Sequence, residues 1–166
     1  SRDRLLLTGD AFARGPDPLG VWHLIEECRA DMVLGNHDAR LLQQLDALST
    51  NRDPGRVKPD QSFALHALEP VHSTLLAWLH RVPLYIEEDR FLLVHAGINP
   101  ERGLADTRFE EFITIRTWPP AKGRIDGPRW HDAYRPVHPL LIFGHDAPGG
   151  LVVRHRGGRE GGPDAE

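Results

Sequence analysis

Four short apolar runs in this chain each end in a glycine and a side chain that can bind a metal ion. They are "LLLTGD" at residues 5–10, "VLGNHD" at 33–38, "LLVHAG" at 92–97 and "LIFGHD" at 141–146. A short, continuously apolar run is typical of a buried strand. Because loops at the strand ends of an α/β sheet converge on one crevice, the four runs predict a sheet whose ends share a single site.

The first third of the chain has the pattern of a parallel sheet. Residues 4–10 predict a strand, Pro18 is placed to begin a helix that continues over 19–29, and residues 31–34 predict a second strand. The order strand, helix, strand within about 30 residues indicates a βαβ unit.

The remaining segments predict further helices and strands. The predicted elements are a helix over 39–48, a surface loop over 49–61, a helical pair over 63–82 divided at Pro70, two strands within 83–97, and a long loop over 117–130. A chain of 166 residues with 40% hydrophobic content is long enough for one core. We therefore expect one α/β domain over residues 1–154 and a disordered, Gly-rich tail over 155–166.

Composition excludes several classes of partner. The formal net charge of −4 gives no reason to expect binding to nucleic acid or to an anionic membrane. No apolar run approaches the roughly 20 residues that span a bilayer, and the single cysteine, Cys28, cannot form an internal disulfide. We expect a protein of the reducing cytoplasm.

Each polar residue at the strand ends also has an ordinary structural interpretation. Asp10 could form a turn or cap a helix, and Asn36 could take a left-handed turn conformation while Asp38 caps the next helix. His95 or His145 alone could be a buried, hydrogen-bonded histidine. Their coincidence at four strand ends favours a shared site.

The residue types favour a metal-dependent reaction at that site. One carboxylate, one amide oxygen and two imidazoles, from Asp10, Asn36, His95 and His145, suit Mn²⁺, Fe²⁺ or Zn²⁺ better than Mg²⁺. Arg14 could supply a fixed cation for an anionic substrate, and His37 could donate a proton. Together these groups suggest phosphoester hydrolysis.

The motifs "GDAFARGPD", "GNHDARLL", "VHAGINP" and "FGHD" resemble, in this order, those of the calcineurin-like metallophosphoesterases. The resemblance is to the branch that holds serine/threonine phosphoprotein phosphatases and symmetrical bis(5′-nucleosyl)-tetraphosphatases. It implies a β-sheet sandwich flanked by helices, with a dinuclear metal centre at the strand ends.

The resemblance also implies a role for each site residue. Asp10 would bridge the two metals, and Asn36, His95 and His145 would complete one metal site. The expected catalytic residues are His37, as general acid, with Arg14 and Arg116 holding phosphate. Asp38 is expected to cap a helix. Manganese is the expected metal, with iron and zinc as alternatives.

The chain departs from the family pattern in two ways. Ala13 stands where phosphoprotein phosphatases have an aspartate that pairs with the catalytic histidine, and this favours dinucleoside polyphosphates as substrates. The family's first Asp-x-His motif and its closing Asp-Thr-Gly strand are not found. We therefore expect a domain that lacks its first strand and closing strands, with the second metal site lacking its ligands.

The expected activity is hydrolysis of dinucleoside tetraphosphates to nucleoside diphosphates by attack of metal-bound water. Two alternatives remain open at this point. One is a serine/threonine phosphoprotein phosphatase, and the other is an inactive, truncated family member that retains at most one metal. The sequence does not determine the oligomeric state.

Overall fold

The computed structural model describes residues 3–120, 127–135, 137, 140–146 and 152. Its strands form two small sheets. The strands are β1 (Leu6–Leu7), β2 (Asp31–Met32), β3 (Tyr85–Glu88), β4 (Phe91–Val94) and β5 (Leu141–Ile142). Strands β1 and β2 pair in parallel, while β4 pairs antiparallel with β3 and parallel with β5. The predicted tail over 155–166 lies outside the described residues.

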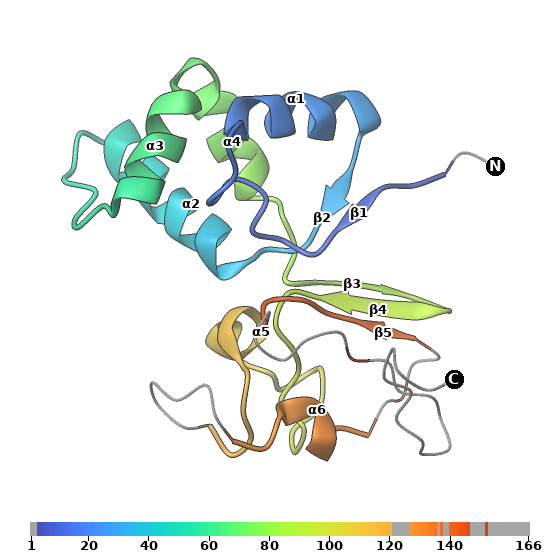
Figure 1. The fold of residues 1–166 in the computed structure, drawn as a ribbon. Helices are drawn as coiled ribbons and strands as arrows, with labels where there is room; N and C mark the ends of the chain where they lie inside the picture. Colours follow the sequence, from blue (N-terminus) through green and yellow to red (C-terminus); the bar gives the residue numbers. More distant parts are fainter. Residues whose placement is uncertain (1–2, 121–126, 136, 138–139, 147–151, 153–166) are drawn as a thin grey trace.

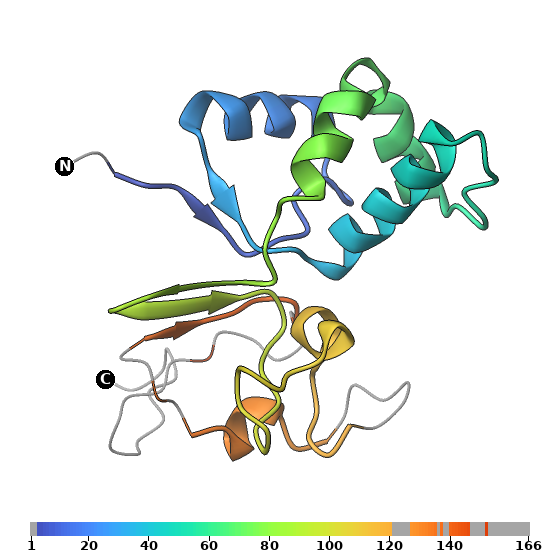
Figure 2. The ribbon, with the colours of Figure 1, turned by 180° about the vertical axis from the view of Figure 1, so that it is seen from behind.

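Helices cover both sides of these strands. The helices are α1 (Pro18–Cys28), α2 (Asn36–Ser49), α3 (Pro59–Ala67), α4 (His72–Leu79), α5 (Phe109–Thr114) and α6 (Trp130–Ala133), with a 3-10 turn at Glu69–Val71. Helices α1 to α4 lie on one side of the strands, and α5 and α6 lie on the other (Figures 1 and 2). The arrangement is the mixed α/β fold that the sequence predicts.

The predicted βαβ unit is present as β1, α1 and β2. Pro18 occupies the first turn of α1, and the Asp17 side chain accepts a hydrogen bond of 2.8 Å from the Gly20 N–H. Arg29 ends the helix in the left-handed conformation, with φ of 51°. Local capping therefore sets both ends of the crossover between the parallel strands.

Several element boundaries differ from the sequence prediction. Helix α2 begins at Asn36 rather than at residue 39, and α3 begins at Pro59, inside the predicted surface loop. Pro59 is compatible with a first helical position, and the Gln61 side chain accepts the Lys58 N–H at 2.9 Å. The short helices α5 and α6 were not predicted, because 6 and 4 residues carry too little periodicity to be recognised.

The polar residues after β4 form a buried network that holds the following loop. Asn99 is fully buried, and its Oδ1 accepts hydrogen bonds from the N–H groups of Glu101 and Arg102, each at 3.0 Å. Its amide donates to Glu111 Oε1 at 2.7 Å. These three hydrogen bonds of the buried Asn99 side chain hold the turn that leaves β4 against α5.

An aromatic cluster joins the loop after β1 to the helices. Phe12, two residues after Asp10, has its ring centroid 6.4 Å from that of Trp22 on α1 and 6.3 Å from that of Trp78 on α4. The two tryptophans meet edge to face with centroids 5.4 Å apart. The helical layer thereby holds the segment that carries Asp10.

Within the described residues, no helix is long and apolar enough to cross a membrane.

Substitution of Trp22 tests the contribution of this cluster. Trp22→Ala removes a side chain that is 2% exposed and is expected to lower the free energy of unfolding by about 3–5 kcal/mol. Leu24→Ala, on the same helix at a residue that is 57% exposed, is the matched control and should change it by less than about 0.5 kcal/mol. Urea denaturation measures both. Equal losses of unfolding free energy in the two variants would show that Trp22 contributes no more to stability than an exposed residue of the same helix.

Candidate metal centre and cleft

His95 follows β4, and its ring orientation is fixed by the other sheet. Its Nδ1 lies 2.6 Å from the carbonyl oxygen of Thr8, which follows β1. Because a carbonyl oxygen can only accept, Nδ1 carries the proton and donates it. In the neutral ring the Nε2 atom is then left with a free lone pair, which is the state of a metal-ligating histidine.

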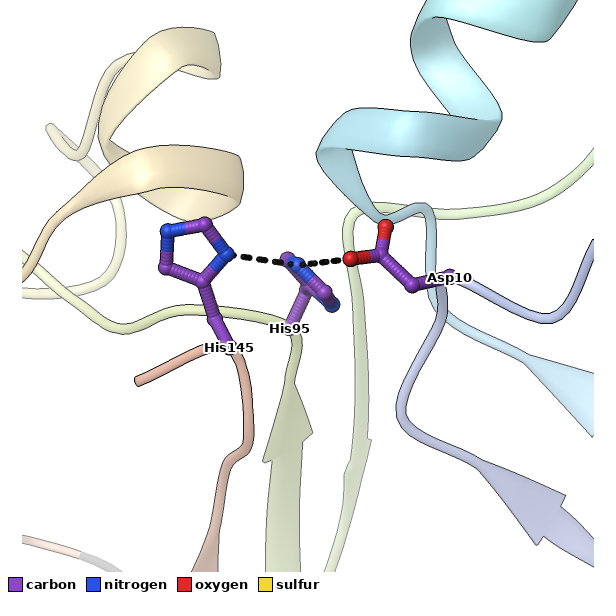
Figure 3. Close-up of side chains that lie close together, drawn as sticks. All are labelled: Asp10, His95 and His145. Atoms are coloured by element: carbon purple, nitrogen blue, oxygen red, sulfur yellow. Dashed lines mark hydrogen bonds and ion pairs between the residues drawn. The ribbon is translucent and has the colours of Figure 1, made fainter. Parts of the chain in front are cut away.

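Three other ligand atoms lie around this Nε2 atom. It is 3.1 Å from His145 Nδ1 and 3.5 Å from Asp10 Oδ2 (Figure 3). It is also 3.2 Å from Asn36 Oδ1. The structure thus brings together all four metal ligands predicted from the sequence. A lone pair facing a carboxylate and an amide oxygen is a poor hydrogen-bonding arrangement but a suitable one for a divalent cation. The residues present therefore fit a metal ion.

The His145 ring is suited to bind a cation. Burial, followed by the nearby Arg116 charge, lowers the pKa of His145 to about 4, so the ring is neutral at physiological pH. Its Nε2 atom is buried and has no hydrogen-bond partner among the described residues. Neutral imidazole is the form that ligates metals.

Asp10 is held by the start of α2. Its Oδ1 accepts the backbone N–H of His37 at 2.9 Å, which leaves Oδ2 facing His95. A close approach between two backbone segments makes this possible. A Cβ at Gly35 would overlap the Asp10 carboxylate, and a Cβ at Gly9 would crowd Gly35 and His95. Both positions therefore require glycine.

Asp38 joins the segment that carries Asp10 to the segment that carries Gly35. Its buried carboxylate accepts the N–H groups of Asp10 at 2.6 Å, Gly35 at 3.0 Å and Ala11 at 3.2 Å. Asp38 does contribute to the cap of α2, but from inside the first turn: Gly35 is the N-cap residue, and Asp38, three residues later, accepts its N–H. Burial and the charge of Asp10 raise the pKa of Asp38 to about 7, while the three N–H donors act in the opposite direction.

Three site residues take the left-handed backbone conformation that side chains disfavour. The φ angles are 59° at Asp10, 64° at Arg14 and 67° at His145. Such angles are uncommon outside glycine and cluster at functional sites.

Three of the four predicted metal ligands, Asp10, Asn36 and His145, line a cleft of about 610 Å³. The predicted phosphate-binding and acid residues Arg14, His37 and Arg116 all line it. The other lining residues are Asp10, Asn36, Arg40, Arg56, Lys58, Gln61, Thr114 and His145. The volume lies within the usual range for small-molecule sites.

Sequence reasoning did not assign Asp146, which forms ion pairs with Arg116 in this cleft and with Arg129. Its Oδ1 lies 3.5 Å from Arg116 Nε and its Oδ2 lies 2.9 Å from Arg129 Nη1. The first contact is an ion pair without a hydrogen bond. The position directly after His145 was the only signal in the sequence.

A second carboxylate missed by sequence reasoning lies near His37. Asp60, on α3, borders the same small hollow as Ala13 and His37, and its Oδ2 is 4.0 Å from Arg14 Nε. Ala13 itself offers no carboxylate to the histidine. Because Asp60 comes from a helix far along the chain, local sequence spacing could not indicate it.

Among the described residues, one cluster of three His, Asp, Glu or Cys side chains could hold a metal, formed by Asp10, His95 and His145. Residues 1–165 match the model of the calcineurin-like phosphoesterase family, and the chain belongs to this family. The resemblance in its motifs is confirmed at that level. Members of the family are metal-dependent, in agreement with the cluster.

Proteins named symmetrical bis(5′-nucleosyl)-tetraphosphatase are among its relatives. One from Klebsiella aerogenes is 41% identical over 104 residues, which cover 60% of this chain and 38% of the relative. One from Chromobacterium violaceum is 31% identical over 163 residues, which cover 86% of this chain and 53% of the relative. The chain thus spans about half or less of these relatives.

A solved structure supports the same relationship. The crystal structure of a "putative diadenosine tetraphosphatase" aligns with a TM-score of 0.69 and 26% identity. The alignment covers 92% of this chain and 65% of that one.

Removal of His95 tests the metal centre. His95→Ala is expected to weaken Mn²⁺ binding by about 100-fold or more, because the loss of a direct ligand exceeds the 10- to 100-fold effect of outer partners. Isothermal titration of the metal-free protein measures the affinity. His66→Ala, at a histidine whose side chain is 87% exposed, is the matched control and should bind as the wild type does. Wild-type affinity in the His95 variant would contradict the assignment.

Replacement of Asp38 tests the three hydrogen bonds that its carboxylate accepts from backbone N–H groups. In Asp38→Asn one carboxylate oxygen becomes an NH₂ group that opposes a backbone N–H, which is expected to lower the free energy of unfolding by about 1–3 kcal/mol. Urea denaturation at pH 8, above the pKa of about 7, measures the change. Asp53→Asn is the control, since its exposed side chain can still accept the Gly55 N–H. A loss no larger than that of the control would contradict the role of Asp38.

Proposed function

We propose that this chain carries the catalytic site of a metal-dependent phosphoesterase that hydrolyses dinucleoside tetraphosphates to nucleoside diphosphates. The observation that carries the proposal is the convergence of Asp10, Asn36 and His145 on the free nitrogen of His95. Asp10, Asn36 and His145 line the same cleft as Arg14, Arg40, Arg56 and Arg116. A metal ion beside fixed cations is the arrangement that phosphoryl transfer requires.

Asp10, Asn36, His95 and His145 would hold the cation, for which we propose manganese, with iron or zinc as alternatives. When bound, the ion would polarise a phosphoryl oxygen and make water a stronger nucleophile near neutral pH. The position of His95, fixed through Thr8, keeps its lone pair directed to that ion. The burial of His145 keeps its ring neutral and available.

His37 is proposed as the general acid. It lies in the first turn of α2, where its backbone N–H binds Asp10, and its side chain lines the cleft. Water attacks the phosphorus and releases one proton to the solvent, the bond from phosphorus to the bridging oxygen breaks, and His37 in its protonated form gives that oxygen a proton, to be protonated again from solvent before the next turnover. The proposed acid, His37, lies next to the proposed ligand Asn36 in the first turn of α2.

Arg14 and Arg116 are proposed to hold the phosphate under attack. Arg14 has an exposed side chain that reaches the cleft, and Arg116 is partly buried there beside Asp146. Guanidinium groups bind phosphate oxygens in a bidentate manner, so they can fix the orientation of the reacting group. The paired Asp146 restricts the orientation of Arg116.

Three observations support a dinucleoside polyphosphate as substrate. The relatives described above carry the name bis(5′-nucleosyl)-tetraphosphatase. In this chain Ala13 occupies the position at which phosphoprotein phosphatases have an aspartate. The size of the cleft also exceeds the needs of a single phosphate group.

Turnover of diadenosine tetraphosphate tests the proposal. The Mn²⁺-loaded protein is expected to convert it to two molecules of ADP, measured by chromatography. His37→Gln should lower kcat by about 10²- to 10⁴-fold, because the leaving oxygen loses its proton donor. The metal content of this variant should stay at the wild-type value, and His66→Gln serves as the control.

Other outcomes distinguish the alternatives. A protein that binds Mn²⁺ but leaves diadenosine tetraphosphate intact would contradict the proposed activity and favour a binding role. Faster release of phosphate from a phosphoserine peptide than from the dinucleotide would favour a phosphoprotein phosphatase.

A further inference from the structure

Three cations in the cleft have no part in the site described so far. Arg40 lies on α2, and Arg56 and Lys58 lie on the connection between α2 and α3. They line the same cleft as His37 and Arg116. We call Arg40, Arg56 and Lys58 the basic wall.

The backbone that carries the basic wall is held in place. Arg40 Nη2 donates a hydrogen bond of 3.0 Å to the carbonyl oxygen of Arg56, and its Nη1 donates to Gln43 Oε1 at 3.3 Å. The Lys58 N–H donates to Gln61 Oε1 at 2.9 Å. The connection is therefore tied to α2 at one residue and to α3 two residues later, which positions both side chains over the cleft.

The basic wall has no acidic counterpart. In the part of the chain that the structure describes, no carboxylate forms an ion pair with Arg40, Arg56 or Lys58. Among the described residues, those that line the cleft include Arg14, Arg40, Arg56, Lys58 and Arg116 but a single carboxylate, Asp10. Arg14 and Arg116 also have acidic partners, Asp60 and Asp146, whereas the basic wall, within the described part of the chain, does not. This local excess occurs in a chain with a formal net charge of −4. Such a charge distribution concentrates anions in the cleft.

The number of cations exceeds what one phosphate group needs. Arg14 and Arg116 are already assigned to the phosphate under attack, and three further cations line the same cleft. We propose that the basic wall is a subsite for the phosphate groups beyond the reacting one, so that it selects a chain of phosphates over a single phosphate ester. The position of the reacting phosphate rests on the proposed function, but the attraction of the wall for polyphosphate does not.

Binding of inorganic phosphates by metal-free protein tests the subsite without any turnover. Isothermal titration is expected to show that tripolyphosphate binds at least about tenfold more tightly than orthophosphate. Charge-assisted hydrogen bonds of this kind change affinity by about tenfold or more. In the double variant Arg56→Gln/Lys58→Gln the ratio of the two affinities should fall by about tenfold. Both residues are exposed, so the thermal midpoint of the variant should stay at the wild-type value.

A charge-matched control separates the subsite from the general charge of the protein. Arg52→Gln/Arg81→Gln removes two exposed cations that do not line the cleft, and its affinity ratio should equal that of the wild type. Equal binding of both phosphates by the wild type, or an unchanged ratio in the Arg56 and Lys58 variant, would overturn the inference. The same loss of ratio in the control would overturn it as well.

The outcome does not depend on the proposed activity. If the double variant loses its preference for tripolyphosphate while the wild type fails to hydrolyse diadenosine tetraphosphate, the subsite stands and the proposed reaction fails. If the wild type hydrolyses diadenosine tetraphosphate and the ratio is unchanged, the reaction stands and the subsite fails.

Discussion

The hydrogen bond from His95 to the Thr8 carbonyl is the contact on which the site depends. It joins the end of β4 to the end of β1, which belong to different sheets. The main chain of His95 adds a second link, because its carbonyl oxygen accepts the Gly144 N–H at 2.8 Å and so holds the segment after β5. One residue therefore sets the relative positions of three strand ends and, through its fixed tautomer, the direction of its own lone pair.

The site combines two opposite electrostatic environments within one cleft. At the strand ends, acceptor atoms from Asp10, Asn36, His95 and His145 face one another and favour a cation. On the helical side, side chains from α2 and the following connection present positive charge. A ligand with anionic phosphates that also contacts a divalent cation satisfies both environments at once. Asp10, His95 and His145 come from segments that follow strands and Asn36 begins α2, whereas the basic wall comes from the second turn of α2 and the connection after it.

Much of this arrangement could be predicted from the sequence because it is local. Each ligand directly follows an apolar run and a strand end, so pattern and residue type suffice to place Asp10, His95 and His145 at one edge. The contributions of Asp60, Arg56 and Lys58 could not be predicted. They depend on how α3 packs across the chain, and the residues before it have the composition of an ordinary surface loop. The start of α2 was also misplaced, since Gly35 caps it without a side chain.

The left-handed conformations of Asp10, Arg14 and His145 have a consequence for how the chain tolerates change. At each position the backbone angle costs about 1 kcal/mol or more relative to glycine, although glycine would also lose side-chain contacts such as the hydrogen bond from the His37 N–H to Asp10. Backbone strain alone would therefore favour the loss of a carboxylate, a guanidinium and an imidazole from one cleft. The stability of the surrounding core offsets this cost, and the strained positions are where gains in stability and retention of chemistry conflict most directly.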